Sequence, residues 1–188
     1  MHTLLLASKS PRRRQLISEL GFPVKFVDIS VEEHISSDIP VEQIAVQLAK
    51  TKAEGYKETL AKDEILVTAD TIVVHQGSVL GKPCDAEHAV EMLKSLAGDW
   101  HTVYTGVCLR DASRTSLFVE STKVLFRDLG DDEIRHYVEM GTCMDKAGAY
   151  GIQEWIGMVG VSRIEGCYYN VMGLPLSRLY QELRSLIK

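Results

Sequence analysis

Apolar positions recur along the chain with two periods, which predict a mixed order of strands and helices. Unbroken or alternating apolar runs predict strands over residues 3–7, 24–29, 65–75, 100–110, 115–126 and 158–164. Apolar residues three and four positions apart predict helices over residues 11–20, 40–57, 86–96, 131–140 and 175–187. This order indicates an α/β fold with a mixed central sheet flanked by helices.

Turn and cap residues set several of these boundaries. Ser10 followed by Pro11 predicts a helix start, because serine caps free N–H groups and proline suits the first helical position. Asp85 is expected to cap the helix that follows it. Gln76-Gly77 is expected to turn the third strand back, and residues 69–71 are expected to interrupt that strand.

Length and composition are those of an ordinary globular protein, and we expect a single domain over residues 1–188. The chain is 45% hydrophobic and 25% charged, so it can bury a core without disulfide bonds or a structural metal. Its four cysteines lie far apart, without a C-x-x-C pair or an evident histidine partner, which argues against a zinc cluster and a disulfide framework. Reduced thiols are typical of a cytoplasmic protein.

Hydropathy and charge argue against three function classes. The apolar run at residues 4–7 is too short for a secretory signal, and basic residues follow it at once. No segment approaches the roughly 20 apolar residues that a membrane span requires. The net charge of −5 argues against a nucleic-acid polymer as partner. Any phosphate binding must therefore come from a local cluster of lysine and arginine.

The segment from Ser8 to Arg13 is a candidate anion site. A strand ends there, a turn carries the hydroxyls of Ser8 and Ser10, and a helix begins with Arg12 and Arg13 in its first turn. Free N–H groups at a helix start bind anions, and an arginine fork matches phosphate oxygens. A capped surface helix with solvated arginines is the alternative, and the spacing alone does not separate the two.

Several other charged residues could complete a phosphate or metal site. Asp70 lies between two apolar segments, where a carboxylate needs a metal, lysine or arginine as partner. Carboxylates at such places can hold Mg²⁺, although a structural aspartate in a turn is the alternative. Glu33 could supply a second carboxylate, although acidic loop pairs are mostly solvated. Lys52 and Lys82 could neutralise phosphate charge, although each alone is more often a surface lysine.

Residues 146–153 are rich in small side chains and end in Gln153. Such a backbone can press close to a planar ligand, and the carboxamide offers a donor and an acceptor to a base edge. A tight structural loop under the core is the alternative. Residues 168–175 predict packing and a helix entry, and we expect no chemistry there.

Taken in order, five segments of the chain resemble the Maf-type nucleotide pyrophosphatases. They are Ser8-x-Ser10-Pro11-Arg12-Arg13, Ala69-Asp70-Thr71, Gly81-Lys82-Pro83, residues 147–153, and Asn170-Val171-x-Gly173-Leu174-Pro175. The resemblance spans nearly the whole chain. It implies a fold of the Maf and ITPase kind, with two lobes around a cleft and a possible homodimer. It also implies metal-dependent hydrolysis of a nucleoside triphosphate between its α and β phosphates.

The resemblance implies a role for each candidate residue. Asp70 falls at the position of the general base, and Lys52 and Lys82 join it as catalytic residues. Asp70 and Glu33 would hold the divalent cation, with Mg²⁺, Mn²⁺ and Co²⁺ as candidates. The sequence does not decide whether Asp70 acts as base, metal ligand or both. The resemblance also implies substrate binding at six positions: Ser8, Ser10, Arg12, Arg13, Thr71 and Gln153.

Two positions imply the substrate class. Arg12 together with Gln153 resembles the branch that acts on dTTP and UTP, whereas the branch acting on 7-methyl-GTP tends to carry an aromatic residue and glutamate there. Glu154 departs from the family, in which glycine usually follows the glutamine, and the change bears on the rim of the base pocket. The alternatives are a pyrophosphatase for 7-methyl-GTP or non-standard purine nucleotides, and a non-catalytic nucleotide sensor that regulates cell division.

Overall fold

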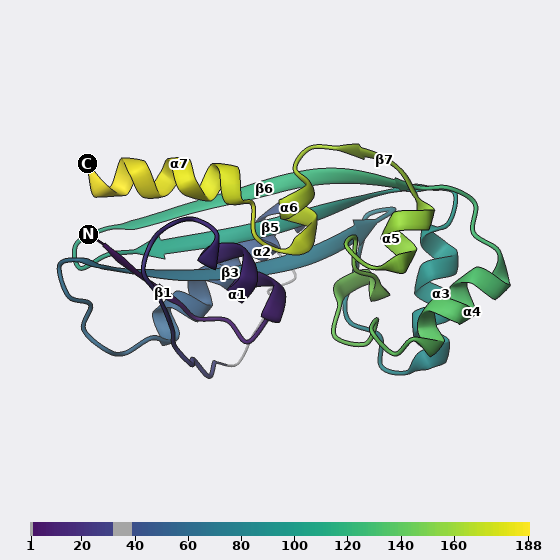
Figure 1. Cartoon of the computed structure of the whole chain (residues 1–188), viewed down its shortest axis with the longest axis horizontal. Coiled ribbons are helices and arrows are strands. Elements are labelled where there is room, and N and C mark those ends of the chain that lie inside the picture. The colour runs from purple at the N-terminus through teal and green to yellow at the C-terminus, as the bar shows by residue number, and fades with distance from the viewer. Residues whose placement is uncertain (1, 32–38) are drawn as a thin grey trace. The chain divides into compact units, whose positions relative to one another are not determined.

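The computed structural model describes residues 2–31 and 39–188. Within this part of the chain, a seven-stranded sheet has the order β2-β1-β3-β5-β6-β7, with β4 paired to β3 (Figure 1). β1 runs parallel to β2 and β3, whereas β4 and β7 pair antiparallel with β3 and β6. The expected mixed α/β fold is therefore confirmed. The strands are β1 (Thr3–Leu6), β2 (Val24–Phe26), β3 (Glu64–His75), β4 (Ser78–Leu80), β5 (Trp100–Arg110), β6 (Thr115–Phe126) and β7 (Val161–Glu165).

The chain packs into two compact units. Unit 1 comprises Met1–Thr71, Thr105–Glu120 and Gly173–Lys188, and unit 2 comprises Ile72–Tyr104 and Ser121–Met172. The long strands β3, β5 and β6 contribute residues to both units. The cleft that the family resemblance implies stays a prediction. Within the described residues, no helix has the length and apolar character needed to cross a membrane.

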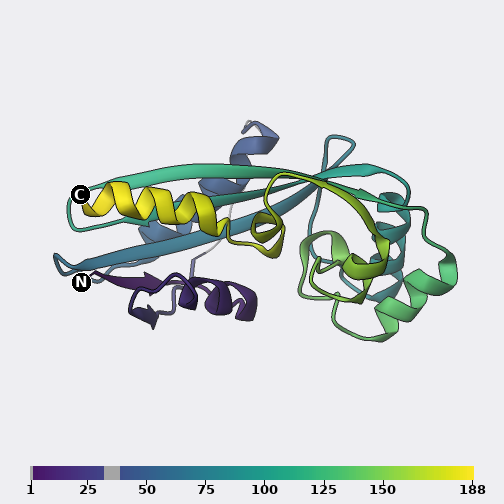
Figure 2. The same cartoon turned by 45° about the horizontal axis from the view of Figure 1, so that its top comes forward.

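Unit 1 places three helices on its part of the sheet, namely α1 (Pro11–Ser18), α2 (Val41–Gly55) and α7 (Leu176–Ile187). Ser10 caps α1 and Pro11 occupies its first turn, as the sequence predicts. The buried stripe of α2 is apolar throughout, which explains why a 15-residue helix forms here. α7 runs beside β6 in both views (Figure 1, Figure 2), and the Ser116 hydroxyl donates to the Glu182 carboxylate at 3.4 Å.

Unit 2 holds the other helices of the described chain: α3 (Ala86–Leu96), α4 (Asp131–Glu139), α5 (Trp155–Gly160), α6 (Tyr168–Met172) and the 3₁₀ turn η1 (Ala147–Ala149). α3 and α4 lie side by side (Figure 1) and share one apolar core with β5 and β6. Leu93, Leu96 and Ile134 are fully buried in that core. The predicted cap is confirmed, since the Asp85 carboxylate accepts the backbone N–H of His88 at 2.8 Å.

Three predicted strands differ from the structure. The strand predicted over residues 24–29 ends at Phe26. β3 is not interrupted at residues 69–71, because the Asp70 side chain reaches a lysine partner from within a continuous strand. The predicted strand at 158–164 begins only at Val161, because Met158 belongs to α5. Met158 is 71% exposed, so the apolar run was not the buried strand that it resembled.

A buried histidine makes the stability of unit 2 depend on pH. His101 is 2% exposed, its Nε2 lies 2.7 Å from the Tyr150 hydroxyl, and its ring stacks on Phe126. Burial, aided by the nearby charge of His75, lowers the pKa of His101 from 6.5 to about 3. Because the unfolded chain then binds this proton more readily than the folded protein, stability falls as pH drops from 6.5 towards 3.

We expect His101→Gln to weaken this pH dependence, because glutamine can still hydrogen-bond Tyr150 but does not titrate. Between pH 7 and pH 5, the wild type should lose about 2 kcal/mol more of its unfolding free energy than the variant. Urea unfolding at both pH values measures the difference. The carboxylates are the same in the two proteins, so their contribution to the pH dependence cancels in the comparison. Equal losses in the two proteins would contradict the assignment.

Candidate functional site

The site in unit 1 depends on how closely α2 approaches the sheet. Gly106 in β5 permits this approach, because a Cβ there would lie 2.1 Å from the backbone nitrogen of Val46. The Thr68 hydroxyl in β3 donates to the Ala49 carbonyl at 2.6 Å. These contacts fix the middle of α2 against two neighbouring strands.

The carboxyl end of α2 is held by a second device. Arg110 donates to the carbonyl oxygens of Ala53 and Tyr56 at 2.8 and 2.9 Å. Carbonyl groups in the last turn of a helix have no partner within the helix, so the guanidinium satisfies them and anchors the helix end. Lys52 lies in this anchored last turn.

Lys52 and Asp70 form an ion pair at the centre of this arrangement. Lys52 Nζ lies 2.7 Å from Asp70 Oδ2, and the other carboxylate oxygen accepts the backbone N–H of Thr71 at 2.7 Å. The two side chains are only 21% and 16% exposed. Asp70 is thus a partly buried, partnered carboxylate, as its place between apolar segments predicts.

Arg13 connects α1 to the strand that carries Asp70. Its Nε donates to the Gly173 carbonyl at 2.7 Å, and its Nη2 donates to the Thr71 hydroxyl at 2.8 Å. The Thr71 hydroxyl also lies 2.9 Å from that of Thr105. The structure therefore brings Arg13, Thr71, Asp70 and Lys52 together in unit 1.

The turn before α1 gathers the remaining predicted residues of unit 1. The Ser8 hydroxyl accepts the backbone N–H of Ser10 at 3.2 Å, and the Ser10 hydroxyl accepts that of Arg13 at 3.5 Å. Because a hydroxyl that accepts still carries its own proton, both serines can donate to an anion. Arg12 lies half-buried in the first turn of the same helix.

Lys82 and Gln153 lie in unit 2, and Lys82 is exposed on the segment after β4. The Gly81 carbonyl next to it accepts the backbone N–H of Gly148, which joins two of the predicted segments. Gln153 is half-buried, and no described residue donates a hydrogen bond to its buried Oε1. A buried acceptor without a donor costs free energy, so this oxygen is suited to a donor on a ligand.

Of the two predicted metal ligands, the structure describes Asp70, whereas Glu33 lies outside the described residues. Within the described ranges, no three His, Cys, Asp or Glu side chains gather in a way that could hold a metal ion. Asp70 alone still fits the chemistry, because Mg²⁺ is often held by one or two protein carboxylates together with substrate phosphates.

Cys84 has a histidine partner that the sequence did not lead us to expect. Its Sγ lies 3.1 Å from Nδ1 of His88, so the expectation that no cysteine has a histidine partner is wrong. The i, i+4 spacing of the two residues at the start of α3 could have revealed this pair. All four cysteines lie among the described residues and carry free thiols.

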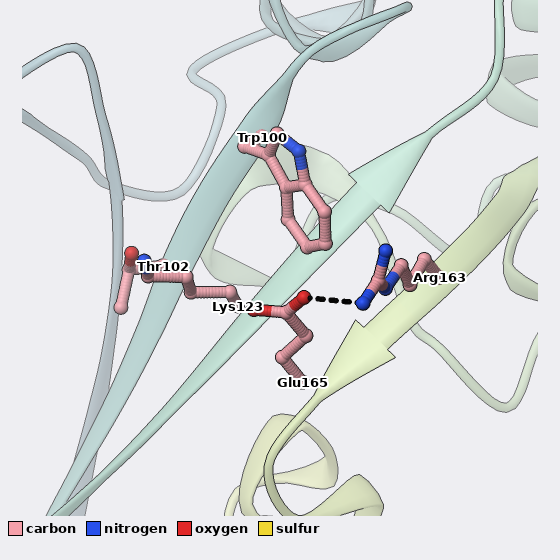
Figure 3. Close-up of a pocket in the computed structure, with 5 residues that line it drawn as sticks. All are labelled: Trp100, Thr102, Lys123, Arg163 and Glu165. Atoms are coloured by element: carbon pink, nitrogen blue, oxygen red, sulfur yellow. Dashed lines mark ion pairs between the residues drawn. The ribbon is translucent and has the colours of Figure 1, made fainter.

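A cavity of about 480 Å³ opens in unit 2 on β5, β6 and β7 (Figure 3). Its lining residues are Trp100, Thr102, Lys123, Arg163 and Glu165, none of which is a predicted site residue. Arg163 pairs with Glu165 at 3.0 Å, and their side chains are 66% and 44% exposed. Surface charges that already pair with each other give no specific chemistry, so we assign the candidate site to the hydrogen-bonded groups above.

Several positioning residues were not among the predicted site residues. Gly106, Thr68 and Arg110 seat α2, and Gly173 supplies the carbonyl that holds Arg13. The segment around Gly173 is expected to carry packing and a helix entry but no chemistry, and its contact with Arg13 is a positioning role that leaves this expectation a prediction. Gly173 has φ +110°, a backbone conformation that other residues rarely adopt, so its role could have been suspected from glycine alone.

Comparisons with known proteins identify relatives over nearly the full length of the chain. The sequence model of one family, described as Maf-like protein, matches residues 3–186. A dTTP/UTP pyrophosphatase of Bacteroides fragilis is 46% identical over 187 residues, covering 98% of this chain and 96% of that protein. Proteins of the same name from Bacteroides thetaiotaomicron and Flavobacterium johnsoniae are 46% and 43% identical, covering 98% and 99% of this chain and 96% of each relative.

Solved structures support the fold. The Ham1 protein of Staphylococcus aureus superposes with a TM-score of 0.55 at 14% identity, covering 98% of this chain and 99% of that one. A HAM1 protein from Coxiella burnetii gives a TM-score of 0.52 at 15% identity, with coverage of 98% and 100%. At such low identity the likeness concerns the fold alone.

We expect Arg13→Ala to destabilise the protein, because the variant loses two hydrogen bonds from a charged donor. The expected loss is about 1.5–3 kcal/mol of unfolding free energy. Lys9→Ala, which removes an exposed charge just before the same helix, should change stability by less than about 0.5 kcal/mol. Urea unfolding measures both variants, and equal effects would show that the Gly173 and Thr71 contacts do not stabilise unit 1.

Proposed function

The chain belongs to the family of Maf-like proteins, and we propose that it hydrolyses dTTP and UTP to the nucleoside monophosphate and pyrophosphate. Relatives that are 43–46% identical carry the name dTTP/UTP pyrophosphatase. The observation that carries the catalytic part is the partly buried contact between Lys52 and Asp70. It combines a carboxylate that can accept a proton with a cation that can neutralise phosphate.

In the proposed reaction, Asp70 is the general base. Its carboxylate takes a proton from a water molecule whose oxygen forms a bond to the α-phosphorus. The bond between the α-phosphorus and the bridging oxygen then breaks, and that oxygen leaves as part of pyrophosphate. The backbone N–H of Thr71 and the ammonium of Lys52 hold the carboxylate in one orientation, which such a proton transfer requires.

The cationic side chains of unit 1 are proposed to stabilise the negative charge that develops on the phosphates. Lys52 contributes its ammonium group, and Arg13 is held in place by Gly173 and Thr71 before any ligand binds. Preorganised cations stabilise a phosphoryl transition state without a further cost of reorganisation. Ser8 and Ser10 add hydroxyl donors, and Lys82 is proposed to act on the phosphates as well.

We propose that the reaction requires a divalent cation, which can be Mg²⁺, Mn²⁺ or Co²⁺. Bound at Asp70, with Glu33 as a second ligand, it would neutralise phosphate oxygens and polarise the phosphorus. The donor chemistry of Asp70 supports this choice, since a carboxylate is a ligand that these hard cations prefer.

Gln153 is proposed to recognise the base. Uracil and thymine both present an N–H donor beside a carbonyl acceptor, and a carboxamide complements this pair with its oxygen and its N–H group. The buried Oε1 of Gln153, which no described residue hydrogen-bonds, supports this role. Arg12 is proposed to contribute to the same choice of substrate.

The proposal includes the cellular setting of the enzyme. We propose that residues 1–188 act as one functional domain, since the family model matches residues 3–186. A cytoplasmic homodimer that binds neither a membrane nor a nucleic-acid polymer completes the description. The free thiols support a reducing compartment such as the cytoplasm, and the net charge of −5 argues against a nucleic-acid polymer, whereas the homodimer rests on the family resemblance.

Asp70→Asn should lower kcat by roughly 10²-fold or more, the usual scale for loss of a general base. Binding of dTTP should change less, because the cations remain. Pyrophosphate release measures kcat, and calorimetry measures binding. Glu64→Gln is the matched control, since Glu64 lies in the same strand and pairs with Lys25 at 3.2 Å. An Asp70→Asn enzyme with wild-type turnover would rule out the assignment.

Gln153→Glu should lower kcat/KM for dTTP and UTP by roughly 10- to 100-fold relative to 7-methyl-GTP, because a carboxylate cannot donate to the pyrimidine carbonyl. The ranking of the three nucleotides is measured with one enzyme preparation, so the active fraction cancels. An unchanged ranking would refute base recognition by Gln153.

A panel of nucleotides separates the proposed function from its alternatives. Preferred turnover of 7-methyl-GTP or of non-standard purine triphosphates would assign the chain to a different substrate class. Absence of pyrophosphate release with Mg²⁺, Mn²⁺ and Co²⁺ at mildly alkaline pH would favour a nucleotide sensor instead.

A further inference from the structure

Glu154 directly follows Gln153 in the chain, and its side chain lies in an unusual environment. Its side chain is only 19% exposed and forms an ion pair with Lys146, which is 7% exposed, at 2.9 Å. Its other carboxylate oxygen accepts from the hydroxyl of Thr142 at 3.0 Å and from that of Tyr137. A charge buried to this extent requires such partners.

These contacts close the turn that carries Gln153. The Tyr137 hydroxyl donates to Glu154 and accepts the backbone N–H of Gly151 at 3.1 Å. The backbone N–H of Glu154 in turn donates to the Gly151 carbonyl at 3.0 Å. The two ends of the four-residue turn are thus joined twice, once through the main chain and once through the Glu154 side chain.

The sequence of the turn suits this closure. A Cβ on Gly151 would lie 2.8 Å from Cδ of Glu154 and 3.0 Å from Cε of Lys146, so a larger residue there would displace one of these two side chains. Ile152 is 4% exposed and anchors the middle of the turn in the core of unit 2. Gln153 is the remaining residue of the turn, and its backbone is fixed on both sides.

We propose that Glu154 is a positioning residue that holds the carboxamide of Gln153 in the orientation required to select a pyrimidine base. This inference rests on the proposed role of Gln153. Glu154 does not touch the substrate. It acts through Tyr137 and Lys146, which fix the turn before the nucleotide arrives, so that the cost of ordering Gln153 is not paid on binding.

The test is a double-mutant cycle read as a selectivity ratio. The ratio is kcat/KM for dTTP divided by kcat/KM for a purine triphosphate such as dITP, and it does not depend on the fraction of folded enzyme. Glu154→Gln removes the charge that pairs with Lys146 and should lower the ratio about 10-fold, chiefly through a higher KM for dTTP. In a Gln153→Ala background, the same substitution should leave the ratio unchanged.

Two further variants keep the result interpretable. Tyr137→Phe removes the hydroxyl that joins Gly151 to Glu154 but keeps the ring, so it replaces Glu154→Gln if that variant does not fold. Glu133→Gln is the matched control. Glu133 caps α4, the helix that also carries Tyr137, and it pairs with Arg127 at 2.6 Å. It should lower stability without changing the ratio.

The outcomes separate the inference from the function on which it rests. If Gln153→Ala leaves the ratio unchanged, base recognition by Gln153 is wrong. If Gln153→Ala lowers the ratio while Glu154→Gln and Tyr137→Phe do not, or if Glu154→Gln acts equally in both backgrounds, Glu154 is a structural residue only and the inference is overturned.

Discussion

The contact between Lys52 and Asp70 depends on one steric constraint, the close approach of α2 to β5 at Gly106. A side chain at that position would meet the helix backbone at 2.1 Å and move the helix away from the sheet. The Thr68 hydroxyl and the Arg110 guanidinium then fix the middle and the end of the helix. Because Lys52 lies in the last turn, any shift of α2 would move its ammonium group relative to a carboxylate that sits on a rigid strand. The chemistry proposed for unit 1 therefore follows from helix packing as much as from the charged residues themselves.

In unit 2, too, packing and buried polar contacts hold a proposed functional group in place. Here they fix a short turn, residues 151–154, instead of a helix. Gln153 sits in a turn whose ends are joined through Tyr137 and Glu154, and the buried Lys146 compensates the charge of the glutamate. Each unit thus holds its proposed functional groups in place through residues that do not themselves act on the substrate. Such preorganisation is what electrostatic catalysis and base selection require, because groups that are already oriented need no reorganisation when the ligand binds.

Local patterns in the sequence predict most of the fold, and the failures have identifiable physical causes. The alternation in residues 100–126 gives the bounds of β5 and β6, and the caps at Ser10 and Asp85 give the helix starts, because these signals act between near neighbours. The contacts that assemble the site join residues far apart in the chain: Arg13 and Gly173 are separated by 160 positions. No periodicity reports such a pairing, and the family resemblance was needed to bring these segments together. The apolar run at Met158 was misread because composition does not distinguish an exposed short helix from a buried strand.

If Asp70 and Lys52 act as proposed, the protein directs water to the α-phosphorus of a pyrimidine nucleoside triphosphate. Hydrolysis of dTTP in ¹⁸O-labelled water, followed by mass spectrometry of the products, tests it most directly. We expect the label to appear in dTMP and the released pyrophosphate to be unlabelled. Label in pyrophosphate, or release of dTDP and inorganic phosphate, would contradict it.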